Sequence, residues 1–206
     1  MTDRETLYSG LSNAAWGYFL IHFNFNLGLG GSSINILPEF AGFLLLRSAI
    51  GKLSGERRDL ALLRPLCTLL AWWHGAKWAL AIVGVDMGDI QFVYLSLIVM
   101  TATLYFHYQF LTDMAFLAEK YQPPGEGLDR RIRGRRTALL VLSTGFDLLG
   151  SLVQLFRWEE QASALAGAVT CVAAVVLILV VLIMVSLFQL RRFVREWNLE
   201  TPASLE

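Results

Sequence analysis

Residues 162–187 read ASALAGAVTCVAAVVLILVVLIMVSL and contain no charged side chain. A helix over this stretch would be about 39 Å long at 1.5 Å per residue. That length exceeds the roughly 30 Å hydrocarbon core of a bilayer. The stretch therefore predicts a membrane-spanning helix in an integral membrane protein.

Five weaker apolar segments precede this stretch. Together the six segments predict an all-α fold, a polytopic six-helix transmembrane bundle that forms a single domain over residues 1–206. The second segment is near the lower limit for spanning a bilayer, so a re-entrant helix stays open as an alternative there. The expected spans are 7–29, 36–50, 65–85, 90–112, 137–156 and 162–190.

The basic residues are distributed unevenly around these spans, although the formal net charge is zero. If the six spans alternate in direction, all of the 17 Lys and Arg residues except Lys77 and Arg157 fall on one side. Cytoplasmic loops carry an excess of Lys and Arg. The pattern therefore predicts cytoplasmic N and C termini and a multi-pass protein of a bacterial-type plasma membrane.

Apart from Glu39 and Arg47 near the two ends of the second span, five Asp, Lys and His residues lie inside the expected spans, where such side chains are costly and usually face protein or water. His22, Lys77 and Asp147 lie about midway along their spans, roughly 15–18 Å deep. His74 shares a helix face with Lys77 because it lies three residues earlier. His107 is expected somewhat closer to the cytoplasm. We predict that these five residues bind a ligand at a polar mid-membrane site between the first, third, fourth and fifth helices.

Lys77 and Asp147 have matching expected depths, which suggests that they pair. An unpaired ammonium or carboxylate at that depth would lose its charge, so each residue can satisfy the other. Three interpretations stay open. The pair belongs to a site for a substrate, ion or proton, or it fixes the arrangement of the helices, or the two residues do not contact each other.

The function predicted from these features is binding or translocation of a small solute. The chain has no HxxxH, HExxH, CxxCH or GxSxG spacing, so no catalytic residue and no metal ligand is assigned, the cofactor is unknown, and an enzyme is not favoured. One alternative is a haem or redox protein, or another membrane-embedded enzyme, that uses the histidines.

A second alternative is a structural or regulatory membrane subunit that docks a cytoplasmic partner through an arginine-rich loop. The loop is expected between the fourth and fifth spans, and such a cluster beside a membrane also attracts anionic lipid headgroups. Nucleic-acid binding is not expected because the segment is short and adjoins the bilayer. The arginines are Arg130, Arg131, Arg133, Arg135 and Arg136.

Overall fold

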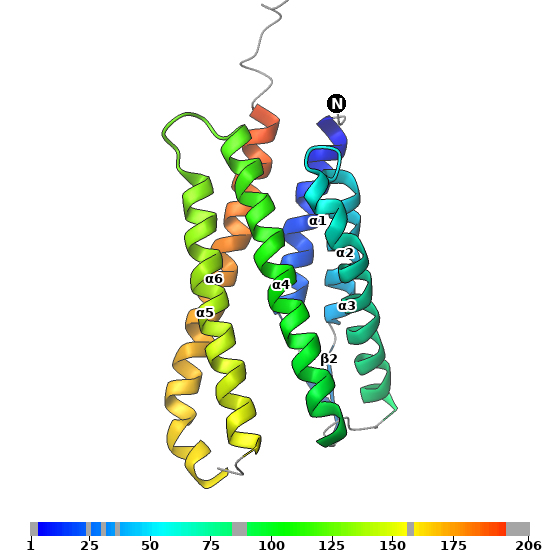
Figure 1. Cartoon of the computed structure of the whole chain (residues 1–206), viewed down its shortest axis with the longest axis vertical. Coiled ribbons are helices and arrows are strands. Elements are labelled where there is room, and N and C mark those ends of the chain that lie inside the picture. Colours follow the sequence, from blue (N-terminus) through cyan, green and yellow to red (C-terminus); the bar gives the residue numbers. More distant parts are fainter. Residues whose placement is uncertain are drawn as a thin grey trace, which may run out of the picture.

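The structure is a computed structural model that describes residues 4–23, 26–29, 32–35, 38–83, 90–155 and 159–196. The described chain is almost entirely helical, with six helices and one short antiparallel hairpin (Figure 1). The elements are α1 (Arg4–His22), β1 (Asn26–Leu29), β2 (Ser32–Asn35), α2 (Glu39–Leu53), α3 (Arg58–Ile82), α4 (Ile90–Tyr121), α5 (Leu128–Leu155) and α6 (Glu159–Glu196).

The six helices form a closed ring. Each helix packs against the next in sequence order, and α6 returns to pack against α1. Helix α1 begins and α6 ends at the same end of the bundle, where the α2–α3 turn and the α4–α5 loop also lie (Figure 1). We call this the terminus end.

Helices α1 and α2 approach so closely that their backbones touch at two glycines. A Cβ atom added at Gly42 would lie 2.8 Å from the carbonyl oxygen of Gly17, and one added at Gly17 would lie 2.9 Å from the carbonyl oxygen of Gly42. Small residues permit close approach of this kind between helices. The glycine pair therefore fixes where α1 crosses α2.

The first expected span, residues 7–29, extends beyond the C-terminal end of the helix that the structure shows. Helix α1 ends at His22, and Asn26 to Leu29 instead pair antiparallel with Ser32 to Asn35. The two strands are separated in the sequence by Gly30-Gly31, a dipeptide favoured in two-residue hairpins.

Helices α3 to α6 extend beyond the expected spans at the terminus end. Helix α3 begins at Arg58, so Pro65 lies inside the helix rather than at its start. Helix α5 begins at Leu128, so the five arginines expected in a loop lie on the first turns of a helix. Hydropathy marks where a chain can cross a bilayer, but charged residues such as arginine are good helix formers and continue the helix past that point.

Within the described residues, one helical segment is long and apolar enough to cross a membrane, Val169–Glu196. Only 22% of its most apolar window is buried, so it is not the core helix of the bundle. The six-span prediction is not confirmed by this criterion. Arg157, one of the two basic residues expected away from the terminus end, lies outside the described residues.

The α4–α5 loop is closed by a single glutamine. The Gln122 side-chain carbonyl accepts hydrogen bonds from the backbone N–H groups of Leu128 (2.7 Å) and Asp129 (3.3 Å), while its amide donates to the Asp129 carboxylate at 2.9 Å. The loop also uses positive φ angles at Gly125 and Gly127, which glycine adopts without a steric penalty. The hydrogen bond from Gln122 lowers the pKa of Asp129.

This lowered pKa predicts how stability depends on pH. Because the folded state favours the ionised carboxylate, the contribution of Asp129 is present above its unfolded pKa, near 3.9, and is lost as pH falls through the lower folded value. Asp129→Asn should cost about 1 kcal/mol at pH 7 and much less at pH 2, measured as the difference in thermal midpoint in detergent. Glu126→Gln, which alters an exposed pair with Arg131, is the control. A cost that stays the same at both pH values would contradict the assignment.

Candidate functional site

A pocket of about 550 Å³ lies inside the ring of helices. All six helices contribute to its wall, including α2 and α6, which were not expected to take part. Most of the lining is apolar, as in α6, which supplies Ala173, Val176, Leu177 and Val180. The polar side chains of the lining are His22, Glu39, His74, Lys77, Ser96, Thr103, His107 and Ser143.

Four of the five residues predicted from the sequence line this one pocket: His22, His74, Lys77 and His107. The side chain of Asp147 lies outside the described residues, although its neighbour Phe146 lines the pocket. The proposed pairing of Lys77 with Asp147 therefore stays a prediction. Helices α3 and α5 are not neighbours in the ring, so such a pair would have to reach across the pocket.

His22 and His107 meet directly at the pocket. Their ring centroids are 5.1 Å apart with planes tilted by 48°. His22 stacks on Tyr18 at 4.6 Å, and its Nδ1 lies 3.0 Å from the Tyr18 carbonyl oxygen. A carbonyl oxygen only accepts hydrogen bonds, so Nδ1 carries the proton in this contact and a neutral His22 keeps its lone pair on Nε2.

Nδ1 of His74 contacts the Glu39 carboxylate of α2, and the His74 ring stacks on Phe43 with ring centroids 5.1 Å apart. A carboxylate that accepts from one imidazole nitrogen fixes the orientation of the ring. Sequence reasoning missed Glu39 as a site residue, since it was placed at the outer end of its helix rather than beside His74.

Three polar atoms at or beside the pocket are buried and have no hydrogen-bond partner among the described residues: Tyr18 Oη, His74 Nε2 and His107 Nδ1. Buried polar groups in native proteins nearly always have a partner, which can be water or a ligand. The side chain of His107 is the most enclosed of the three histidines, with the residue only 6% exposed. The wall therefore holds hydrogen-bonding capacity that its own side chains do not use.

The arrangement suits stacking and hydrogen bonding better than metal binding. Among the described residues, no group of three or more His, Cys, Asp or Glu side chains is placed to hold a metal ion. Two haem ligands would have to approach the iron from opposite faces of the porphyrin, whereas the rings of His22 and His107 contact each other. Cys67 is buried and does not line the pocket, and its thiol donates to the Phe43 carbonyl oxygen at 3.1 Å.

The five arginines of α5 are largely occupied by contacts within the bundle. Arg133 donates to Glu119 at 2.6 Å, Arg136 donates to Thr112 at 2.5 Å, and Arg135 donates to Ser186 and to the Leu182 carbonyl of α6. Arg131 pairs with Glu126, and both side chains are exposed. Arg130 is also exposed.

Comparisons with protein-family models, with curated proteins and with solved structures find no match to this chain.

Proposed function

We propose that this protein is a multi-pass membrane protein that binds a small solute in the central pocket and passes it across the bilayer. The observation that carries the proposal is the convergence of all three histidines of the chain, from α1, α3 and α4, on one pocket. Pockets that bind small molecules are typically 300–1,000 Å³, mostly apolar, with a few polar groups that fix the orientation of the ligand.

Exposed apolar side chains support a membrane setting for several helices. Leu62, Trp72 and Val83, in or directly after α3, are each 76% exposed, and Ile98 of α4 and Val141 of α5 are each 66% exposed. Large apolar surfaces are rare on water-soluble monomers. In a bilayer these side chains would contact lipid tails, in addition to the exposed apolar face of α6.

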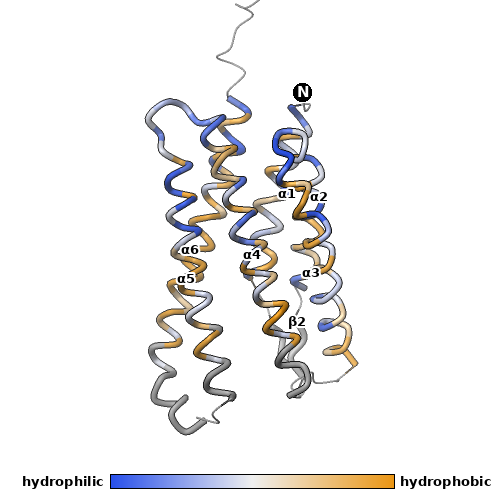
Figure 2. The backbone as a smooth tube through the Cα atoms, in the orientation of Figure 1, coloured by the Kyte–Doolittle hydropathy of each residue, from blue (hydrophilic) through white to orange (hydrophobic). Residues whose placement is uncertain are grey.

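Charge supports an orientation with the terminus end in the cytoplasm. Figure 2 shows hydrophilic residues gathered at the terminus end and mainly apolar residues along the middle of the bundle. Ion pairs such as Arg57–Asp113, Lys120–Glu56 and Arg133–Glu119 lie at this end. The cytoplasmic orientation itself rests on the excess of Lys and Arg in the segments expected at this end, as the positive-inside rule describes.

We also propose contact between the terminus end and anionic lipid headgroups, in a narrower form than the sequence suggested. Arg133, Arg135 and Arg136 donate to side chains of neighbouring helices, whereas Arg130 and Arg131 are exposed and, within the described part of the chain, make no hydrogen bond or ion pair to another helix. These two are therefore the members of the cluster most open to headgroups. Each basic residue near an anionic surface contributes about 1 kcal/mol. A partner subunit would meet the same two side chains.

The direct test of solute binding is native mass spectrometry of gently purified protein. We expect a defined small-molecule mass on the wild type, and at least a tenfold loss of its occupancy in His107→Leu, because a buried hydrogen-bonding group is removed. Tyr105→Phe is the control, since this α4 side chain is 57% exposed and does not line the pocket. A bare polypeptide mass for the wild type, or equal occupancy in both variants, would contradict the proposal. A haem mass with a visible absorption band would favour the redox alternative.

A further inference from the structure

The pocket wall becomes more exposed with distance from the terminus end. On α4, His107 and Val99 are buried, whereas Ser96, farther from the terminus end, is exposed. On α6, Val180 is buried and Leu177 is exposed. Helices α3 and α5 show the same trend, from the half-buried His74 to the exposed Lys77 and from the buried Leu139 to the exposed Phe146. Among the described residues, the buried part of the pocket wall therefore lies toward the termini, and the exposed part lies away from them.

An aromatic layer closes the pocket on the terminus side. It consists of Tyr18 from α1, Phe43 from α2, and Phe106 and Phe110 from α4, all of them fully buried. Tyr18 and Phe110 stack with centroids 6.4 Å apart, and Phe106 lies 5.8 Å from both Phe43 and Phe110. These rings join α1 and α2 to α4 across the centre of the ring of helices.

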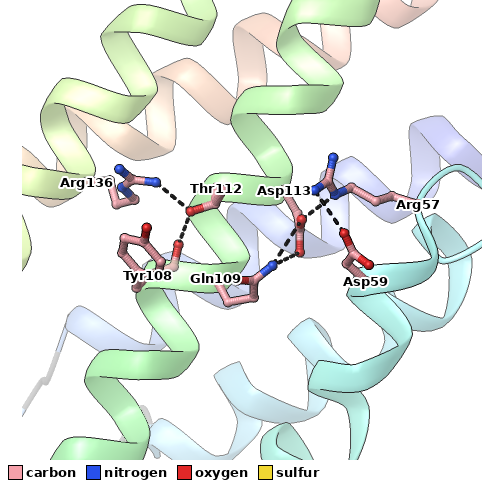
Figure 3. A network of polar contacts seen from close by, with 7 residues as sticks. All are labelled: Arg57, Asp59, Tyr108, Gln109, Thr112, Asp113 and Arg136. Carbon is pink, nitrogen blue, oxygen red and sulfur yellow. Dashed lines mark hydrogen bonds and ion pairs between the residues drawn. The ribbon is translucent and has the colours of Figure 1, made fainter.

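A second layer of polar contacts lies beyond the aromatic layer. Arg57, just before α3, pairs with Asp113 of α4 at 2.5 Å, and Gln109 also donates to Asp113 (Figure 3). Nearby, Glu56 accepts from Lys120 at 2.6 Å and from the Tyr121 hydroxyl at 2.8 Å. We call the contacts of Glu56 and Arg57 with α4 the polar latch.

The polar latch joins two halves of the ring, one formed by α1 to α3 and the other by α4 to α6. The halves contact each other where α3 packs against α4 and where α1 packs against α6, and we call these two contacts the seams. Of the neighbouring pairs in the ring, α3 and α4 share the least extensive packing. The Asp113 side chain is 0% exposed, and buried ion pairs add little net stability compared with apolar residues but can specify one arrangement over another. The Arg57–Asp113 pair lies at the seam with the least extensive packing, so it is suited to separate and form again when the two halves move.

We propose that the solute reaches the pocket from the end opposite the chain termini, and that the aromatic layer and the polar latch form a closed gate on the terminus side. Passage to the terminus side then requires the α3–α4 seam to open and the Arg57–Asp113 and Glu56–Lys120 pairs to separate. This inference rests on the proposed binding function, because it assigns the side from which that pocket is loaded.

The test is thiol accessibility in membrane vesicles of both orientations, with a charged, membrane-impermeant maleimide as the probe. Both native cysteines are first replaced by serine, and Ser143→Cys places one thiol on the pocket wall. Glu126→Cys in the exposed α4–α5 loop reports which vesicle face carries the terminus end. We expect the pocket thiol to react at least tenfold faster from the opposite face than from the terminus face.

Latch variants should open the terminus side. Asp113→Asn and Glu56→Gln should each raise labelling from the terminus face at least fivefold, and Glu56→Gln serves as the milder variant if Asp113→Asn fails to fold. The matched control is Glu119→Gln, since this α4 carboxylate pairs with Arg133 of α5 inside one half. Equal wild-type rates from both faces, no labelling from either face, or latch variants that match Glu119→Gln would overturn the gate.

The two proposals fail separately. Labelling needs no ligand, so a clear asymmetry with a bare polypeptide in native mass spectrometry would remove the solute and keep the gate. A bound solute together with equal labelling rates from both faces would keep the binding proposal and remove the gate.

Discussion

Gly42→Ala should be among the most damaging single substitutions in this protein. The new Cβ atom would lie 2.7 Å from the Ile21 side chain, 2.8 Å from the Gly17 carbonyl oxygen and 2.9 Å from the Ile21 backbone nitrogen. Two of these atoms belong to the backbone of α1 and cannot rotate away, so the helices must separate. We expect a loss of about 3 kcal/mol, at the upper end of overpacking effects.

The measurement is the thermal midpoint in detergent together with the monodisperse fraction on gel filtration. The matched control is Gly51→Ala, the same change in the same helix, where nothing lies within 4 Å of the added atom. Alanine is the better helix former, so this control should stabilise the protein by about 0.5–1 kcal/mol. Two losses of equal size would show that α2 tolerates no alanine for reasons other than the contact with α1.

Arg57→Met should have the second large effect. It removes the cation that faces Asp113, whose carboxylate is fully buried. Removing one partner of a buried pair costs 3–5 kcal/mol when both charges are buried, and about 2–3 kcal/mol is expected here because the Arg57 side chain is 25% exposed. The lost stacking of Arg57 over Phe116, at 3.9 Å, adds to the cost.

A double-mutant cycle separates the charge effect from packing. Arg57→Met combined with Asp113→Leu should recover most of the lost stability, because no charge is then left buried alone. Arg131→Met is the comparison, since its pair with Glu126 is exposed and should contribute less than 1 kcal/mol. If the double variant is as unstable as the sum of its two single variants, Arg57 and Asp113 do not stabilise each other.

The sequence indicated which residues should face the interior, because ionisable side chains avoid lipid. His22, His74, Lys77 and His107 all line the central pocket, as that rule leads one to expect. Their role in binding a ligand stays a prediction. The sequence could not show, however, that the pocket wall includes α6. A helix with no ionisable residue across its core is expected to face lipid. The α6 part of the pocket wall is apolar, so it carries no such signal.

Long-range pairs were beyond sequence reasoning for a different reason. Glu39 and His74 lie on helices of opposite direction, and a depth estimate with an error of a few residues cannot align them. The Arg57–Asp113 pair depends on α3 beginning at Arg58 and α4 continuing to Tyr121, both beyond the limits that hydropathy detects. A local signal did exist for the hairpin, in the Gly30-Gly31 dipeptide, and it was outweighed by the apolar residues on either side.

The backbone contact between Gly17 and Gly42 has a mechanical consequence. Sliding α1 along α2 would force two touching main chains apart, so these two helices form the stiff part of the molecule. Compliance is then concentrated where the packing is least extensive, at α3 and α4. Amide hydrogen exchange should reflect this difference, with the slowest exchange in the middle of α1 and α2 and faster exchange along the facing turns of α3 and α4.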